Sequence, residues 1–172
     1  GQYLLTGGAD DSVSVLWDAF SGERIYEFSG HRWSVTAVAF SPDGAIAATG
    51  TGGNGMLASG DNTIRLWNTA TGNYMGAISG HTDAITDLVF SPAGGIMASA
   101  SSDGSVRLWG IPVKSQWILR DSGYSINDAK HTSQHVVTGH VDGTIRIWDP
   151  QLKETFRYNA HRGPVFSLAL NP

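Results

Sequence analysis

A short segment that ends in tryptophan recurs four times, and this repetition restricts the fold more than any other feature. The copies are DDSVSVLWD (10–18), DNTIRLWN (61–68), DGSVRLWG (103–110) and DGTIRIWD (142–149). Their tryptophans, Trp17, Trp67, Trp109 and Trp148, stand 50, 42 and 39 residues apart. A unit of about forty residues cannot bury its own apolar faces and packs against copies of itself. The chain is therefore predicted to be an array of similar units.

The segments between these landmarks have the character of β-strands. VTAVAF (35–40), ITDLVF (85–90) and VFSLAL (165–170) are β-branched or aromatic runs, and SVRLW and TIRIW alternate between two faces. SPDG, SDG and VDG supply turn residues between them. No stretch carries an apolar stripe at helical spacing. Four short strands per unit predict an all-β fold of radially repeated sheets, a β-propeller.

The chain resembles the WD40 repeat family over essentially its full length. The resemblance rests on Gly-His near the start of a unit, a serine or threonine four residues before an aspartate, and Trp-Asp at the end of a strand. It implies that His, Ser/Thr, Asp and Trp form hydrogen-bonded structural tetrads, in which buried polar groups satisfy one another. The implied members are His31, Thr49, Asp61 and Trp67; His81, Ser99, Asp103 and Trp109; and Thr138, Asp142 and Trp148.

The repeats divide the chain into about four blade equivalents. We expect a partial blade at 1–28, blades at 31–78 and 81–120, a degenerate blade at 123–158 and the start of a further blade at 159–172. The degenerate blade has Gly123-Tyr124 where the others have Gly-His, and in the first blade either Asp10 or Asp11 fits the acid position. Because propellers of this family usually have seven blades, the chain is expected to be part of a longer propeller.

Residues 50–55 read GTGGNG and match the G-x-G-x-x-G spacing of dinucleotide-binding loops. Such a loop needs a helix directly after the glycines and an acid further along. Here a turn and a strand follow, and the stretch holds eight more residues than the corresponding turn of the next unit. The glycine run is therefore predicted to be an enlarged hairpin loop (50–60).

Composition excludes several functions. Eleven Lys and Arg against fifteen Asp and Glu give a net charge of −4, which does not favour nucleic acid. There is no cysteine, so thiol chemistry and cysteine zinc sites are excluded. The sequence has neither a long apolar run nor a basic leader, so it does not predict secretion or membrane contact. A cytoplasmic or nuclear protein is therefore expected.

The histidines do not indicate a metal or catalytic site. His31, His81 and His161 recur at the repeat period and are explained as scaffold. His135 and His140 lie on a predicted strand, where residues five apart point to opposite faces, so with His131 they are poor co-ligands. No catalytic residue, cofactor, metal or small-molecule substrate is expected.

Loop residues that the scaffold does not explain are the candidates for partner binding. Trp33 beside Arg32 has the composition of an interface hot spot, with packing over the neighbouring blade as the alternative. The full set comprises Arg32, Trp33, Asn54, Thr82, Asp83, Ser101, Ser102, His140 and Arg162.

The function expected from the resemblance is a non-catalytic scaffold that assembles a multiprotein complex through its propeller face and rim, with other proteins or peptides as partners. The alternative is a module that recognises a substrate or phosphopeptide, such as a ubiquitin-ligase receptor or a propeller similar to that of an autophagy scaffold.

Overall fold

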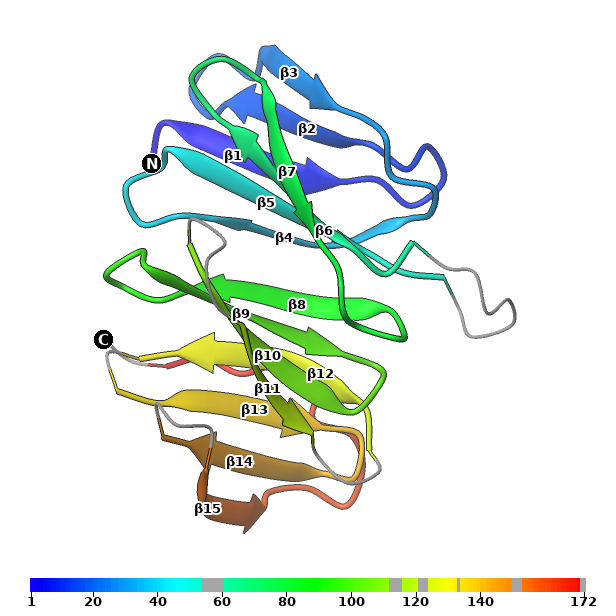
Figure 1. Ribbon diagram of the computed structural model, residues 1–172, viewed down its shortest axis with the longest axis vertical. Helices are drawn as coiled ribbons and strands as arrows, with labels where there is room; N and C mark the ends of the chain where they lie inside the picture. Colours follow the sequence, from blue (N-terminus) through cyan, green and yellow to red (C-terminus); the bar gives the residue numbers. More distant parts are fainter. Residues whose placement is uncertain (54–60, 112–115, 121–123, 133, 150–152, 171–172) are drawn as a thin grey trace. The chain divides into compact units, whose positions relative to one another are not determined.

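The computed structural model describes residues 1–53, 61–111, 116–120, 124–132, 134–149 and 153–170, with backbone alone for 116–120. Within these residues the regular structure is antiparallel β-strand, without a helix (Figure 1). The all-β prediction is confirmed. The described part of the chain has no helix long and apolar enough to cross a membrane.

The strands form four sheets in chain order. The first sheet contains β1 (Tyr3–Gly7), β2 (Ser14–Asp18) and β3 (Arg24–Phe28). The second contains β4 (Val35–Phe40), β5 (Ile46–Thr51), β6 (Ile64–Asn68) and β7 (Tyr74–Ile78). The third contains β8 (Ile85–Phe90), β9 (Ile96–Ser101), β10 (Ser105–Gly110) and β11 (Gln116–Arg120). The fourth contains β12 (Ile126–His131), β13 (Val136–His140), β14 (Thr144–Trp148) and β15 (Glu154–Asn159). Neighbours in sequence pair antiparallel, so each sheet is a meander.

The chain consists of two compact units, Gly1–Ile85 and Thr86–Pro172. In the first unit, Leu5, Leu16 and Phe28 of the first sheet bury against Ala47 and Trp67 of the second. The Phe28 and Trp67 rings stack with centroids 4.9 Å apart and an angle of 14° between their planes. The repeated tryptophan is thus a core residue that joins two sheets.

The second unit is built in the same way from the third and fourth sheets. Ala98, Val106 and Leu108 pack with Ile126 and Val136 in a buried cluster that also includes Trp148. Small residues at Ala98 and Ala100 let the facing sheet approach closely. The alternation of side chains along each strand directs this set inward.

The first strands of successive repeats are linked by a hydrogen bond at a fixed position. In the first unit, the Thr36 hydroxyl donates to the carbonyl of Ile85, 2.5 Å away. In the second unit, Thr86 donates to Ile126 at 2.6 Å, and the Asn127 side chain donates to Val165 at 2.9 Å. Each donor is the second residue of its repeat's VTAVAF-type segment. The first two bonds satisfy edge carbonyls of the third and fourth sheets. Val165 lies in a segment without regular secondary structure, so the prediction of a strand at 165–170 is wrong.

Candidate functional site

The second sheet brings His31, Thr49, Asp61 and Trp67 together. Trp67 Nε1 donates to Thr49 Oγ1 at 2.9 Å, and Thr49 Oγ1 lies 2.8 Å from His31 Nε2. His31 Nδ1 lies 3.3 Å from Asp61 Oδ2, which also accepts the backbone N–H of Arg32 at 3.0 Å. The loop that carries His31 is therefore tied to strands β5 and β6.

The charges of this group follow from its burial. Burial lowers the pKa of His31, and this outweighs the opposite effect of Asp61, so the imidazole is neutral at pH 7. Burial alone would raise the pKa of Asp61, but hydrogen bonds from Thr63 and from the Arg32 N–H hold it below its usual value. A neutral imidazole that donates from Nδ1 to Asp61 can accept the Thr49 hydroxyl at Nε2. The four side chains then form one chain of donors and acceptors.

In the third sheet, Trp109 Nε1 donates to Ser99 Oγ at 2.9 Å, and both residues are buried. Asp103 accepts the backbone N–H of Ser105 at 2.9 Å, and the Asp103 N–H donates to Ser101 Oγ at 3.1 Å. His81 is buried and belongs to the first unit.

The fourth sheet holds the corresponding threonine with a histidine from its own strand. Trp148 Nε1 donates to Thr138 Oγ1 at 2.9 Å, and His140 Nε2 lies 2.7 Å from the same oxygen. Thr138 and His140 share a face of β13 because they are two residues apart. This spacing was the sequence signal for the contact. His140 is completely buried, so its assignment as a partner-binding loop residue is wrong.

The aspartate of the fourth sheet pairs with a buried arginine. Arg146 Nη2 lies 3.0 Å from Asp142 Oδ2, and Arg146 Nη1 lies 3.9 Å from Glu154 Oε2. Arg146 is 1% exposed. Burial would raise the pKa of Asp142, but hydrogen bonds from Thr144 and the charge of Arg146 lower it. Asp142 therefore carries its charge at neutral pH, matched by a cation.

In the first sheet, Trp17 Nε1 donates to Thr6 Oγ1 at 2.9 Å. Asp11 Oδ1 accepts the backbone N–H of Val13 at 3.3 Å, which closes the β1–β2 turn. Asp10 and Asp11 are both exposed.

Among the predicted partner-binding residues, Arg32 is exposed and Trp33 is half-buried. The Trp33 ring lies against Gly53, where an added Cβ would be 3.4 Å from ring atom Cδ2. Thr51 Oγ1 bonds the carbonyls of Trp33 and Ser34 at 3.0 and 2.7 Å. Trp33 thus lies over the first residues of the enlarged loop of its own sheet, with part of its ring accessible.

The other predicted partner-binding residues lie in varied environments. Thr82 and Arg162 are exposed, and Asp83 and Ser102 are half-buried. Ser101 is completely buried at the end of β9, so its assignment as a binding residue is wrong. Asn54 and most of the enlarged loop lie outside the described residues.

A polar cluster on the first strands of the second unit was missed at the sequence level. Asp87 Oδ2 accepts the backbone N–H of Ala129 at 2.9 Å and lies 3.4 Å from Lys130 Nζ. Lys130 also contacts Asp128, which accepts the N–H of Leu168. Burial and the hydrogen bond with Asp128 raise the pKa of Asp87 to about 6. The acids at the third position of ITDLVF and INDAKH were the available signal, since the equivalent residue of β4 is Ala37.

Within the described residues, no three His, Cys, Asp or Glu side chains are grouped so that they could hold a metal ion. The recurrent hydroxyls, imidazoles and indoles described above bond to one another inside the sheets. Their arrangement fixes strands and loops.

Comparison with known proteins gives one family. The model of the WD domain, G-beta repeat family (WD40) matches residues 22–68, 72–110 and 114–149. Mouse telomerase protein component 1 is 33% identical over 145 residues, which are 83% of this chain and 5% of that protein. The rice U3 snoRNP-associated protein-like YAOH is 32% identical over 178 residues, which are 99% of this chain and 32% of that protein.

Among solved structures, that of U3-55K matches with a TM-score of 0.74 and 26% identity, covering 95% of this chain and 45% of that one. The chain thus spans less than half the length of each of these proteins.

Proposed function

The chain belongs to the WD40 repeat family, and we propose that it acts as a non-catalytic scaffold that assembles a multiprotein complex through its loops. The main support is that its recurrent polar residues are bonded inside the sheets, while other polar residues beside them are accessible. Thr49, Thr138 and their histidine and tryptophan partners are consumed in internal hydrogen bonds. Arg32 and part of Trp33 are accessible beside them.

The pair of Arg32 and Trp33 is proposed as a contact for a partner protein or peptide. The backbone on both sides is fixed, because the Arg32 N–H bonds Asp61 and the Trp33 carbonyl accepts from Thr51. A fixed backbone at these two residues lowers the conformational entropy lost on binding, and arginine and tryptophan are common in hot spots. The net charge of −4 supports protein rather than nucleic acid as the direct partner.

The names of two relatives support a role in a large multisubunit complex. One is a protein component of telomerase, and another is named as associated with the U3 snoRNP. We propose that this chain likewise serves in a nuclear multisubunit complex. A fluorescent fusion that is excluded from the nucleus would contradict this location.

The test compares the wild type with Trp33→Ala in quantitative affinity capture of partner proteins, followed by a melting curve of each variant. Trp33→Ala should reduce capture of specific partners by about tenfold or more, the loss of a hot-spot side chain, with little change in Tm. Phe20→Ala is the matched control, because Phe20 is 86% exposed in a turn of the same unit. A drop in Tm with unchanged capture would show that Trp33 serves packing instead.

A peptide array in phosphorylated and plain form separates the two kinds of binding module. The scaffold proposal expects binding that does not depend on phosphate. Binding confined to phosphorylated peptides and lost in Arg32→Ala would favour a phosphopeptide receptor, and tight binding of RNA alone would contradict both.

A further inference from the structure

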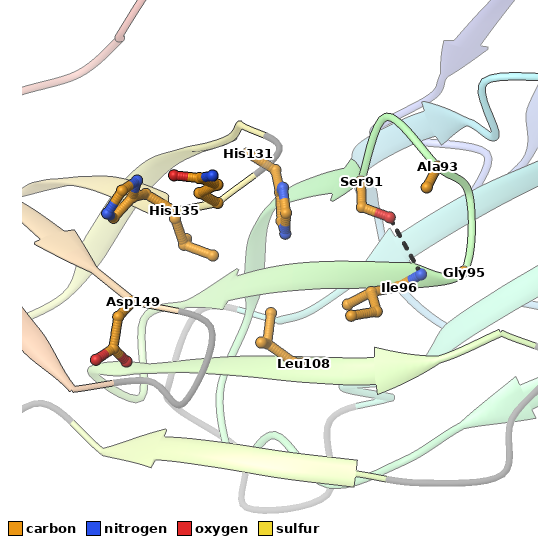
Figure 2. A pocket seen from close by; sticks show the side chains of 10 residues that line it. Ser91, Ala93, Gly95, Ile96, Leu108, His131, His135 and Asp149 are labelled. Carbon is orange, nitrogen blue, oxygen red and sulfur yellow. Dashed lines mark hydrogen bonds between the residues drawn. The ribbon is translucent and has the colours of Figure 1, made fainter.

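The second unit contains a cavity of about 290 Å³ where its core reaches one end of the third and fourth sheets (Figure 2). Its apolar wall includes Ala93 from the β8–β9 turn, Ile96, Leu108 and Val136. The polar part of the lining includes His131, at the end of β12, and Gln134 and His135, just before β13, together with Ser91 and Asp149. Figure 2 shows the His131 ring pointing toward the space above Ile96 and Leu108. The cavity is therefore mainly apolar, with two imidazoles among its few polar groups.

The two histidines stand where the other repeats have apolar residues. His131 pairs with Val136 across the β12–β13 hairpin in the same way that Phe40 pairs with Ala47 across β4–β5. By the same register, His135 corresponds to Ile46. In the first unit, Phe40 packs against the core cluster that contains Leu5 and Trp67. Phenylalanine and isoleucine thus satisfy the packing of the fold at these two positions of the second sheet. Packing alone does not explain the imidazoles at the same positions of the fourth sheet.

The chemistry of His131 restricts what can enter. Burial lowers the pKa of His131 and outweighs the opposite effect of a hydrogen bond with the Thr132 backbone, so the ring is neutral at pH 7, with one donor and one acceptor nitrogen. Its Nδ1 atom is buried and is therefore not the ring nitrogen that a ligand in the cavity can reach. A phenol hydroxyl both donates and accepts, so it can bond a neutral imidazole in either tautomer.

Size and charge point the same way. A cavity of about 290 Å³ is at the small end of ligand sites, which suits one side chain better than a cofactor. Among the residues that the structure describes, the lining contains Asp149 and no lysine or arginine, which disfavours an anionic ligand. Apolar walls suit an aromatic ring, which also stacks on imidazole.

We propose that this cavity binds a tyrosine side chain of a partner protein. The inference rests on the proposed scaffold function and names one feature of its partner. The ring lies against Ile96, Leu108 and Val136, and the hydroxyl bonds His131.

The test uses side-chain analogues and the imidazole NMR signals of the ¹³C-histidine-labelled chain. The probe is p-cresol, with toluene and propylguanidinium for comparison. We expect p-cresol to shift the His131 and His135 signals saturably, and to bind about fivefold more tightly than toluene, the gain of one neutral hydrogen bond. The signal of His161, which is exposed and does not line the cavity, serves as the internal control.

His131→Phe restores the residue type of the other repeats and should abolish saturable p-cresol binding. His135→Ile, the second variant, should keep the preference for p-cresol over toluene, because it leaves His131 in place. Equal binding of toluene and p-cresol, preferred binding of propylguanidinium, or no saturable shift would overturn the proposal. None of these results bears on partner capture through Arg32 and Trp33, so the two proposals fail separately.

Discussion

The second and fourth sheets hold the same buried threonine–tryptophan pair with histidines from different places. In the second sheet, His31 comes from the loop before β4, and its contacts with Thr49 and Asp61 tie that loop down. In the fourth sheet, His140 comes from β13 itself. The loop around exposed Tyr124 is then not the source of the histidine. One hydrogen-bonding requirement is thus met either by a loop or within the sheet, with different consequences for the loop.

The aspartates of the two sheets differ correspondingly. Asp61 is matched by a neutral histidine and by backbone and hydroxyl donors, whereas Asp142 is matched by the charge of Arg146. The aspartate of the fourth sheet is therefore held by a buried ion pair, whereas the aspartate of the second sheet is held by contacts with the loop that carries His31. The predictions below test this difference, from the largest expected effect to the smallest.

Replacement of the buried cation should be the most damaging change. Arg146→Met leaves the Asp142 carboxylate without its charged partner and should lower the free energy of unfolding by about 3–4 kcal/mol. The measurement is urea unfolding at pH 7. Arg157→Met is the control, because Arg157 is an exposed strand residue paired with Glu154. If the two variants lose equal stability, the buried pair is not the special support of the fourth sheet.

Removal of the shared hydroxyl should affect both sheets alike. Thr49→Val and Thr138→Val each deprive a buried indole N–H and an imidazole nitrogen of their partner. Each substitution should lower the free energy of unfolding by about 2–3 kcal/mol. Thr155→Val, which removes one bond from an exposed hydroxyl, should cost under about 1 kcal/mol. Urea midpoints of the three variants measure this. A small effect at Thr138 alone would show that His140 does not use the hydroxyl.

The acid on β8 predicts a pH dependence specific to the second unit. Because the pKa of Asp87 is raised to about 6, the folded state holds a proton there that the unfolded state releases near pH 4. This contribution to stability is complete below about pH 4 and is lost as the pH rises to about 6. Asparagine does not titrate, so Asp87→Asn should not lose this stability as the pH rises. The free energy of unfolding of the variant minus that of the wild type should therefore increase by about 1–2 kcal/mol between pH 4 and 6.5.

Asp43→Asn provides the opposite sign for comparison. The Ser41 hydroxyl and the Ala45 N–H lower the pKa of Asp43, so its contribution is present above pH 4 and lost as the pH falls below it. Thermal unfolding of both variants at a series of pH values separates them. A parallel pH profile for wild type and Asp87→Asn would contradict the assigned proton.

Periodicity was sufficient to predict the fold. The spacing of the tryptophans and the alternation along SVRLW and TIRIW identified the strands and the sheet repeat, and the family is confirmed. The loop position of Trp33 also followed from the register. These features depend on local patterns that recur, so one copy informs the next.

What could not be predicted are the places where one repeat departs from the others. His140 was included among the candidate loop residues although it also lies on a predicted strand, where Thr138 two residues earlier faces the same side. Ser101 was misplaced because β9 continues to that residue. The raised pKa of Asp87 depends on its burial and on Asp128, which comes from another sheet and has no fixed sequence spacing to it.

Backbone hydrogen exchange in His31→Ala and His140→Ala tests the central comparison most directly. His31→Ala releases the loop, so the amide of Arg32, whose N–H bonds Asp61, should exchange at least about tenfold faster, as expected for a lost bond of about 1.4 kcal/mol. His140→Ala should speed exchange within β13 and leave the amides of Tyr124 and Ser125 unchanged. If His140→Ala accelerates exchange at Tyr124 and Ser125 as much as His31→Ala does at Arg32, the fourth sheet also tethers its loop through histidine, and the account is wrong.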